Sequence, residues 1–216
     1  EVRSGRLPVG LSVNSSTGMI TGSVSQSSPY TEVIIEVYNA VGSVSMTLSF
    51  QFTIPPSNFL YSSENIYIPV GKEYVLIPQI EGDPCSYTII DGILPNGLEL
   101  NNTSGVISGI PSESTTHTLI TVKASNNGGS LTCSFNIRAM ILPSITYSIT
   151  YYSMLVDDGF QVVPTLDGDD VSVHIKSGEL PVGFSLNEET GEISGTATKR
   201  VSECKVEIEA ANLVGS

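Results

Sequence analysis

The strongest constraint on the fold is a motif that occurs three times without an internal gap. It reads LPVGLSVNSSTGMITG at 7–22, LPNGLELNNTSGVISG at 94–109 and LPVGFSLNEETGEISG at 180–195. The motif starts, Leu7, Leu94 and Leu180, are 87 and then 86 residues apart, and a second match follows each copy in register: YNAVGS, SNNGGS and ANLVGS. A fixed period of this length indicates tandem copies of one small module.

The period divides the chain into units at 1–54, 55–139 and 140–216. We expect the first to be the C-terminal half of a module, the second to be complete, and the third to lack its last strand. The chain would then be a window on a longer tandem array. An alternative is that residues 44–54 of one copy supply the last strand to the third unit of another copy.

The complete unit reads as strands separated by turn residues, with no helical periodicity. We expect strands near 58–62, 73–80, 85–90, 98–101, 106–109, 117–124 and 131–139. Seven short strands of this kind favour an antiparallel β-sandwich, an all-β fold.

Alternation of apolar and polar residues identifies the face of each strand that points to the core. In TEVIIEVYN the apolar residues share one face, and the same phase recurs one and two periods later. The residues predicted to point inward are Val33, Ile35 and Val37; Ile120, Val122 and Ala124; Val206, Ile208 and Ala210; Val44, Met46, Leu48, Phe50, Phe52 and Ile54; and Leu131, Cys133, Phe135 and Ile137. Such a period of two is typical of a half-buried sheet.

The repeated motif itself reads as a compact hairpin. Leu11, Val13 and Ile20 are its apolar anchors, and the Asn14 side chain can bond the backbone two residues on. Gly18 supplies the left-handed residue that closes the turn. A glycine-rich phosphate loop is the rival interpretation, but no helix follows to present its N-terminus.

The pattern LPxGLxLNxxTGxISG, followed by a strand that ends A-N-x-x-G-S, resembles the putative-Ig repeat family and is similar to dystroglycan-type cadherin-like modules. These modules occur in tandem in surface and secreted proteins of bacteria and protists. The resemblance implies tandem immunoglobulin-like (cadherin-like) β-sandwich modules of about 86 residues. It also implies an adhesive or spacer role at the cell surface or outside the cell, and no catalytic residue shared by the family.

Charge and composition exclude several functions. A formal charge of −13 repels phosphate backbones, so no nucleic-acid partner is expected. No apolar run is long enough for membrane insertion of this segment. His117 and His174 have no nucleophile or acid at a recognisable motif spacing, so we expect no enzyme.

The three cysteines, Cys85, Cys133 and Cys204, have the phase of core residues, and we expect free thiols. In the usual sandwich order the strands of Cys85 and Cys133 flank a third strand. Their separation of about 9–10 Å then exceeds the reach of a disulfide.

A calcium site is one hypothesis for the third unit. Five aspartates cluster in two of its loops, and carboxylates are the oxygen ligands that calcium prefers: Asp157, Asp158, Asp167, Asp169 and Asp170. The matching loops of the second unit hold only Glu73, Glu81 and Asp83. A solvated acidic loop is therefore the favoured interpretation, and no other cofactor is expected.

Glycosylation is a second hypothesis. Asn14, Asn101 and Asn102 are acceptor sequons in a eukaryotic secreted protein, and Asn14 and Asn101 occupy the same hairpin turn. Asn187, their counterpart in the third unit, is followed by two glutamates and is not a sequon.

Together these features favour a non-enzymatic structural or adhesive protein of the cell surface or an extracellular filament. It would act as a stiff spacer or assembly subunit whose partners are neighbouring modules or like copies. The short linkers TIPPSN and ILPSI would limit bending. The alternative is an adhesion module that binds a carbohydrate or a protein; a calcium-dependent form of this module is included in the alternative. Tyr151 and Tyr152 are its candidate contacts, whereas Tyr147 matches Tyr61 and fits a framework role.

Overall fold

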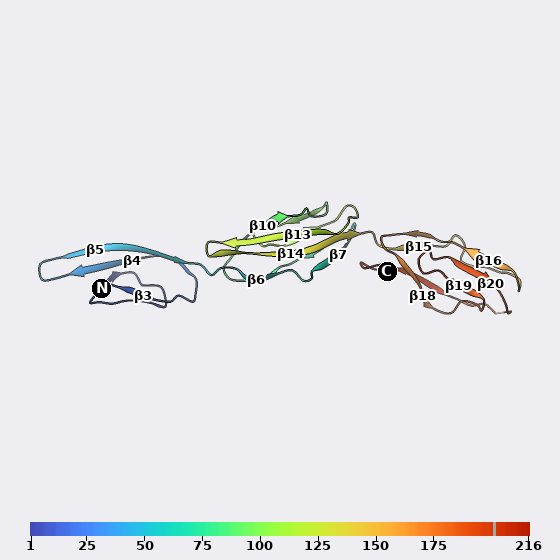
Figure 1. Cartoon of the computed structure of the whole chain (residues 1–216), viewed down its shortest axis with the longest axis horizontal. Helices are drawn as coiled ribbons and strands as arrows, with labels where there is room; N and C mark the ends of the chain where they lie inside the picture. The colour runs from blue at the N-terminus through green and yellow to red at the C-terminus, as the bar shows by residue number, and fades with distance from the viewer. Residues whose placement is uncertain (201) are drawn as a thin grey trace.

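The protein is an end-to-end row of three β-modules, seen in a computed structural model that describes residues 1–200 and 202–216 (Figure 1). Among these residues no helix has the length and apolar character needed to cross a membrane. The strands of the first module are β1 (Val2–Ser4), β2 (Leu11–Val13), β3 (Ile20–Gly22), β4 (Ser28–Tyr38) and β5 (Ser43–Phe52).

The second module is built from nine strands. They are β6 (Ser57–Leu60), β7 (Asn65–Pro69), β8 (Tyr74–Leu76), β9 (Gln79–Glu81), β10 (Ser86–Asp91), β11 (Leu98–Leu100), β12 (Ile107–Gly109), β13 (Thr118–Asn126) and β14 (Gly129–Met140). One layer is the sheet β10-β13-β14-β7, and the other consists of β11-β12-β8 together with the pair β6-β9. All these pairs are antiparallel except β7, which runs parallel to β14.

The third module repeats most of this plan. Its strands are β15 (Ser144–Thr146), β16 (Gly159–Val162), β17 (Thr165–Asp167), β18 (Ser172–Ser177), β19 (Phe184–Leu186), β20 (Ile193–Thr196) and β21 (Glu207–Ala211). They pair as β15-β17, β16-β20-β19 and β18-β21. The chain therefore consists of tandem immunoglobulin-like β-sandwich modules, as predicted.

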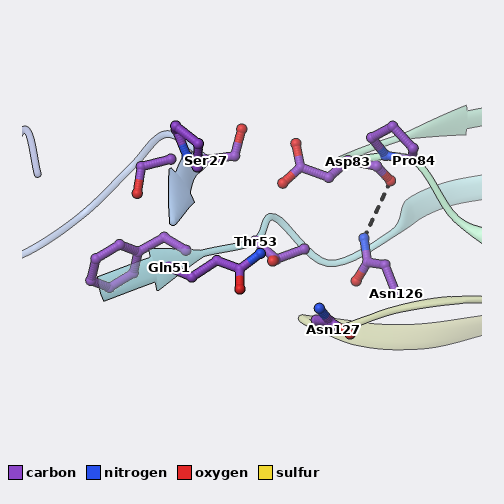
Figure 2. Close-up of a pocket in the computed structure, with 10 residues that line it drawn as sticks. Ser27, Gln51, Thr53, Asp83, Pro84, Asn126 and Asn127 are labelled. Carbon is purple, nitrogen blue, oxygen red and sulfur yellow. Dashed lines mark hydrogen bonds between the residues drawn. The ribbon is translucent and has the colours of Figure 1, made fainter. Parts of the chain in front are cut away.

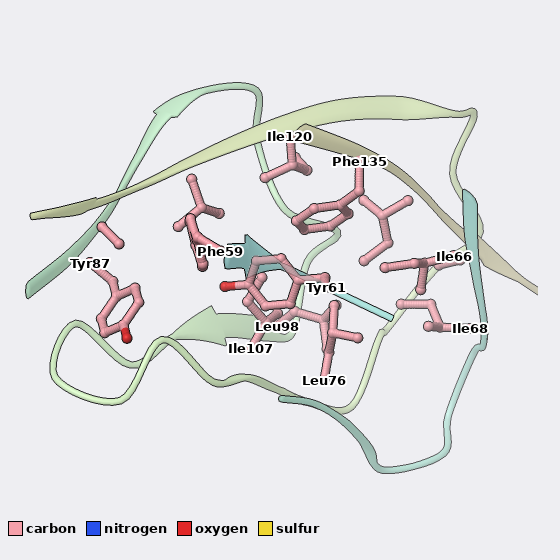
Figure 3. Packing of buried hydrophobic residues seen from close by; sticks show 14 of the residues in the cluster. Phe59, Tyr61, Ile66, Ile68, Leu76, Tyr87, Leu98, Ile107, Ile120 and Phe135 are labelled. Atoms are coloured by element: carbon pink, nitrogen blue, oxygen red, sulfur yellow. The ribbon is translucent and has the colours of Figure 1, made fainter. Parts of the chain in front are cut away.

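The largest core lies between the two layers of the second module (Figure 3). Phe59, Tyr61 and Leu76 face Ile120 and Phe135 across it, and all are at most 6% exposed. The aromatic rings meet at angles: the Tyr61 and Phe135 centroids are 4.8 Å apart with planes tilted by 59°. Burial of this much apolar surface is the main stabilising term of such a sandwich.

Strand prediction succeeded for the second module, with two differences. The segment predicted as one strand at 73–80 is two strands, β8 and β9, because Pro78 between them has no N–H for a ladder. Strand β7 was not predicted. It is short and ends at Pro69. It pairs with β14 through residues far apart in sequence, such as Asn65 with Asn136, so no local pattern indicates the pairing.

The predicted inward face is confirmed where an opposing layer covers it. Val33, Ile120, Val122, Ala124 and Ala210 are buried. The prediction was wrong for Ile54, which follows β5 and is 38% exposed. It was also wrong for three residues at the far end of the β4–β5 hairpin: Val37, Val44 and Met46 are 64%, 71% and 67% exposed. The first module has no strands corresponding to β6–β9, so nothing packs over these side chains.

The inward prediction was also wrong for Cys204, which is exposed, whereas Cys85 is buried and Cys133 is half-buried. In the second module the strand that matches this region, β13, pairs with β14 along its whole length. In the third module β21 begins only at Glu207 and pairs with β18 alone. Cys204 thus lies before the strand, outside the alternation that was used to place it.

Candidate functional site at the module junctions

The positions that distinguish this chain from isolated modules are the two short linkers, between β5 and β6 and between β14 and β15. Each linker carries proline, at Pro55 and Pro56 in the first and at Pro143 in the second. Proline restricts φ, which limits the conformations open to each connection.

Two side chains of the second module hold the first linker at Ile54. The Ile54 N–H donates to Asp83 Oδ2 at 2.9 Å, and the Asp83 N–H donates to the Ile54 carbonyl at 3.2 Å. The Asn126 amide Nδ2 donates to the same carbonyl at 2.8 Å and to the Asp83 carbonyl at 3.2 Å. Both polar backbone groups of Ile54 are therefore bound by the module that follows the linker.

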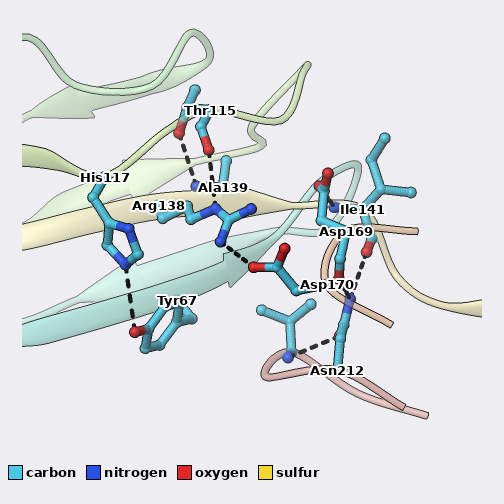
Figure 4. Close-up of polar contacts among 10 residues, drawn as sticks. Tyr67, Thr115, His117, Arg138, Ala139, Ile141, Asp169, Asp170 and Asn212 are labelled. Atoms are coloured by element: carbon cyan, nitrogen blue, oxygen red, sulfur yellow. Dashed lines mark hydrogen bonds and ion pairs between the residues drawn. The ribbon is translucent and has the colours of Figure 1, made fainter. Parts of the chain in front are cut away.

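The second linker is held in the same way at Ile141. The Ile141 N–H donates to Asp169 Oδ2 at 2.7 Å, and Asn212 Nδ2 donates to the Ile141 carbonyl at 2.8 Å and the Asp169 carbonyl at 2.9 Å (Figure 4). Asp169 and Asn212 each lie 86 residues after their counterparts in the second module. We call each pair, Asp83 with Asn126 and Asp169 with Asn212, a linker clamp.

The asparagine of each clamp also holds the turn after its strand. Asn126 Oδ1 accepts from the Gly128 and Gly129 N–H groups at 2.8 and 3.2 Å, and Asn212 Oδ1 accepts from the Val214 N–H at 3.0 Å. One side-chain amide thus connects a turn to a linker: its oxygen accepts from the turn and its nitrogen donates to the linker. The asparagine amide carries an acceptor oxygen and a donor nitrogen on one planar group, so it makes both contacts at once.

The second junction carries a further contact. Arg138, at the end of β14, forms an ion pair and hydrogen bond with Asp170, which lies between β17 and β18 (Figure 4). Arg138 Nε also donates to the Thr115 carbonyl at 3.2 Å, which fixes the guanidinium within its own module. The hydrogen bond to Asp170 is the main reason that the pKa of Arg138 is raised.

The first junction has a hollow of about 390 Å³ instead (Figure 2). Its lining comes from both modules and the linker: Ser27, Ser28, Pro29, Gln51, Phe52, Thr53, Asp83, Pro84, Asn126 and Asn127. The lining is mostly amides and hydroxyls, with one carboxylate and no basic side chain.

The structure separates the five aspartates proposed as calcium ligands. Asp157 and Asp158 precede β16, and the Asp157 N–H donates to the Ala197 carbonyl. Asp169 and Asp170 lie at the second junction, bound to Ile141 and Arg138. Across residues 1–200 and 202–216, no group of three or more His, Cys, Asp or Glu side chains is placed to hold a metal ion. Calcium binding stays a prediction.

The sequon residues lie where the hairpin prediction places them. Asn14 Oδ1 accepts from the Ser16 and Thr17 N–H groups, and Asn101 Oδ1 makes the same pair of bonds to the two residues that follow Asn102. All three sequon asparagines are exposed. Their glycosylation stays a prediction.

The tyrosines proposed as ligand contacts differ from one another. Tyr151 is 71% exposed, whereas the Tyr152 ring packs edge-on against Phe160 at 4.9 Å and its hydroxyl is buried. The Tyr147 hydroxyl donates to the Gly191 carbonyl at 2.5 Å, just as Tyr61 donates to Gly105 at 2.7 Å. Tyr147 therefore belongs to the framework.

The two histidines stand apart from each other. His174 on β18 lies 3.1 Å from the Glu209 carboxylate, and His117 lies 3.4 Å from the Tyr67 hydroxyl. Neither contact includes a serine, threonine or cysteine side chain.

The linker clamps were missed by the sequence analysis, although a signal was present. Gly-Asp recurs at 82–83 and 168–169, one period apart, and the asparagines of the A-N-x-x-G-S match share the same spacing. From the sequence alone, the aspartates are interpreted only as residues of acidic loops and the asparagines only as part of the family pattern. Their joint role appears only when the fold brings the two loops to the same linker.

A family model described as "Putative Ig domain" matches the chain three times, at residues 1–55, 56–139 and 143–215. No curated protein sequence reaches the threshold of a match.

Several solved structures are similar to the chain, to different degrees. The I-band fragment I67–I69 of titin has 16% identity and a TM-score of 0.50, and the match covers 86% of this chain and 71% of that one. Drosophila OTK extracellular domains 3–5 have 12% identity and a TM-score of 0.46, with 95% and 77% covered. A putative alpha-galactosidase of Bacteroides fragilis has 26% identity but a TM-score of 0.34. Its match covers 39% of this chain, which spans only 17% of that enzyme's length. The titin likeness shows a shared fold, and the family matches point to a non-enzymatic module.

Proposed function

The chain belongs to the Putative Ig domain family, and on that premise we propose that it is a spacer in a surface or extracellular protein, a row of modules whose joints resist bending. The observation that supports this is the linker clamp, which occurs in the same form at both junctions. Each clamp binds the two backbone polar groups of one linker residue. The linker cannot turn about that residue without breaking these bonds.

The function follows from mechanics. Pulling or bending the row would load the linkers first, because the linkers lie outside the sheets, whereas the strands of each module are joined by sheet hydrogen bonds. A linker held by side chains of the following module transmits the load to that module's strand ends. Adhesion through neighbouring modules or like copies would use the same rigid row to hold a contact surface away from the cell.

Replacement of the clamp asparagines tests the proposal. Asn126→Asp and Asn212→Asp keep the oxygen that holds the turn but replace the donating nitrogen with an oxygen that repels the linker carbonyl. Asn39→Asp is the matched control. Asn39 holds the same turn in the first module, with Oδ1 accepting from the Val41 and Gly42 N–H groups.

Small-angle X-ray scattering of the full chain is the measurement. We expect the double clamp variant to have a smaller maximum dimension than the wild type and to populate more compact conformers. The Asn39→Asp variant should keep the wild-type scattering profile. Circular dichroism verifies that all three proteins keep their strands. If the folded double variant scattered like the wild type, the clamp would not stiffen the row and the spacer proposal would lose its basis.

A carbohydrate- or protein-binding module is the second candidate. The exposed ring of Tyr151 favours it, since exposed aromatic side chains are common at recognition surfaces. Calcium dependence would belong to this candidate. Glycan-array binding that disappears in Tyr151→Ala, with the fold intact, would favour it over the spacer.

A further inference from the structure

The two junctions share the clamp but differ in everything around it. In the repeat alignment Arg138 corresponds to Gln51, and Asp170 corresponds to Pro84. Glutamine and proline cannot form an ion pair, so the contact that bridges the second junction has no counterpart at the first. We propose that the first junction is a pliant joint and the second a locked joint, so that the second and third modules move as one body.

The hollow between the first two modules supports the pliant joint. It has a volume of about 390 Å³ and lies between Ser27 and Gln51 on one side and Pro84 and Asn127 on the other (Figure 2). Space between two modules lets them approach on that side without displacing packed side chains. The clamp limits rotation at Ile54 itself, so the motion takes place at the linker residues before Ile54, which the clamp bonds do not include.

The second junction is braced from within its own module. Thr115 accepts twice: its carbonyl from Arg138 Nε at 3.2 Å and its Oγ1 from the Ala139 N–H at 3.0 Å. These bonds hold the guanidinium in place before it meets Asp170, which lowers the entropy lost on pairing. Ser28 occupies the Thr115 position in the first module, and its Oγ is buried without a partner among the described residues.

The expected size of the effect is moderate. The Arg138 and Asp170 side chains are 18% and 61% exposed, so the pair is partly screened by solvent. A pair of this kind changes the ratio of closed to open joints by roughly 1.5- to 5-fold. That range is large enough to alter the motion of one module relative to the next.

Residual dipolar couplings of the full chain measure each joint separately, because every module reports its own degree of order in a weakly aligned sample. We expect the second and third modules to share one alignment tensor and the first module to have a lower degree of order. Equal order in all three modules of the wild type would overturn the proposal.

Two reciprocal variants make the test specific. Arg138→Gln should release the third module, whereas Gln51→Arg combined with Pro84→Asp should bring the order of the first module up to that of the second. Arg3→Gln is the control, because it removes an arginine from an exposed ion pair with Glu36 inside one module and should change neither joint.

High salt tests the locked joint without any substitution, in case a variant fails to fold. At about 1 M salt the screening length falls to about 3 Å, so the third module of the wild type should gain mobility and the first should not change. An unchanged third module in both Arg138→Gln and high salt would contradict the locked joint.

The joint proposal rests on the spacer function, but the two fail separately. If the clamp variants bend the row but both wild-type joints are equally ordered, the spacer proposal is supported and the proposed difference between the two joints is refuted. If the clamp variants leave the X-ray scattering unchanged, the spacer proposal is refuted, whatever result the residual dipolar couplings give.

Discussion

The central glycine of the repeated motif has three different environments, so one substitution made three times separates backbone strain from packing. Gly18, Gly105 and Gly191 have φ of +74°, +74° and +70°, the left-handed region that alanine rarely adopts. An added Cβ would lie 2.7 Å from Tyr87 Cε1 at Gly105 and 2.7 Å from Pro164 Cγ at Gly191. At Gly18 it would meet nothing within 4 Å.

The magnitudes follow from these two contributions. The left-handed conformation costs an L-residue about 1–2 kcal/mol, and forcing a methyl into a packed site adds about 1–3 kcal/mol. Gly18→Ala should therefore lower the free energy of unfolding by about 1–2 kcal/mol, and Gly105→Ala by about 2–5 kcal/mol. The Tyr87 ring has little room to give way, because it is 5% exposed and packs 5.9 Å from the Phe59 ring.

Hydrogen exchange with mass spectrometry on the full chain measures the protection of backbone amides in peptides of each module. The method suits a protein whose modules unfold separately. We expect Gly105→Ala and Gly191→Ala to lose more protection in their modules than Gly18→Ala loses in the first. If Gly18→Ala cost as much as Gly105→Ala, backbone strain alone would explain the glycine and the packing argument would be refuted.

Three further predictions concern the core and the acidic loops. Tyr61→Phe removes the buried hydroxyl that donates to the Gly105 carbonyl at 2.7 Å, and chemical denaturation should show a loss of about 1–3 kcal/mol because that carbonyl stays without a partner. Burial raises the pKa of the Tyr61, Tyr87 and Tyr147 phenols above 10.0 and that of the Cys85 thiol above 9.0. The folded protein therefore keeps protons that the unfolded chain loses, and Tm should fall as pH rises above about 9, with no matching change from these groups below it. Finally, millimolar calcium should leave Tm unchanged, since Asp169 and Asp170 already bind the linker and Arg138. A rise in Tm with calcium, absent with magnesium, would contradict this and show that the folded chain binds calcium.

The fold could be predicted because its signals are local and repeated. Each copy of the motif carries its own turn chemistry, and the Asn14, Asn101 and Asn187 side chains all bond the backbone two and three residues on. The period-two alternation then identifies one face of every long strand. Local hydrogen bonds and side-chain alternation need no partner to be known, so sequence alone suffices for them.

Burial could be predicted only where the opposing layer exists. Val33 and Val37 have the same phase on β4, yet the first is fully buried and the second is 64% exposed. Alternation tells which side of a sheet a residue faces, whereas burial depends on whether another layer covers that side. Cys204 is exposed for a different reason: it has the phase of a core residue but lies before the start of β21, where the alternation of a strand does not apply.

By itself, therefore, the sequence determined the module, its period, its hairpin and the positions that need glycine. Only the tertiary structure decided what joins one module to the next. The side chains of each clamp are separated by more than forty residues and act on a linker in a third segment, so no local pattern contains their contact. Asp83 and Asn126 are ordinary turn residues within their own loops, and they become a joint because the strands of the sandwich end at the same edge of the module.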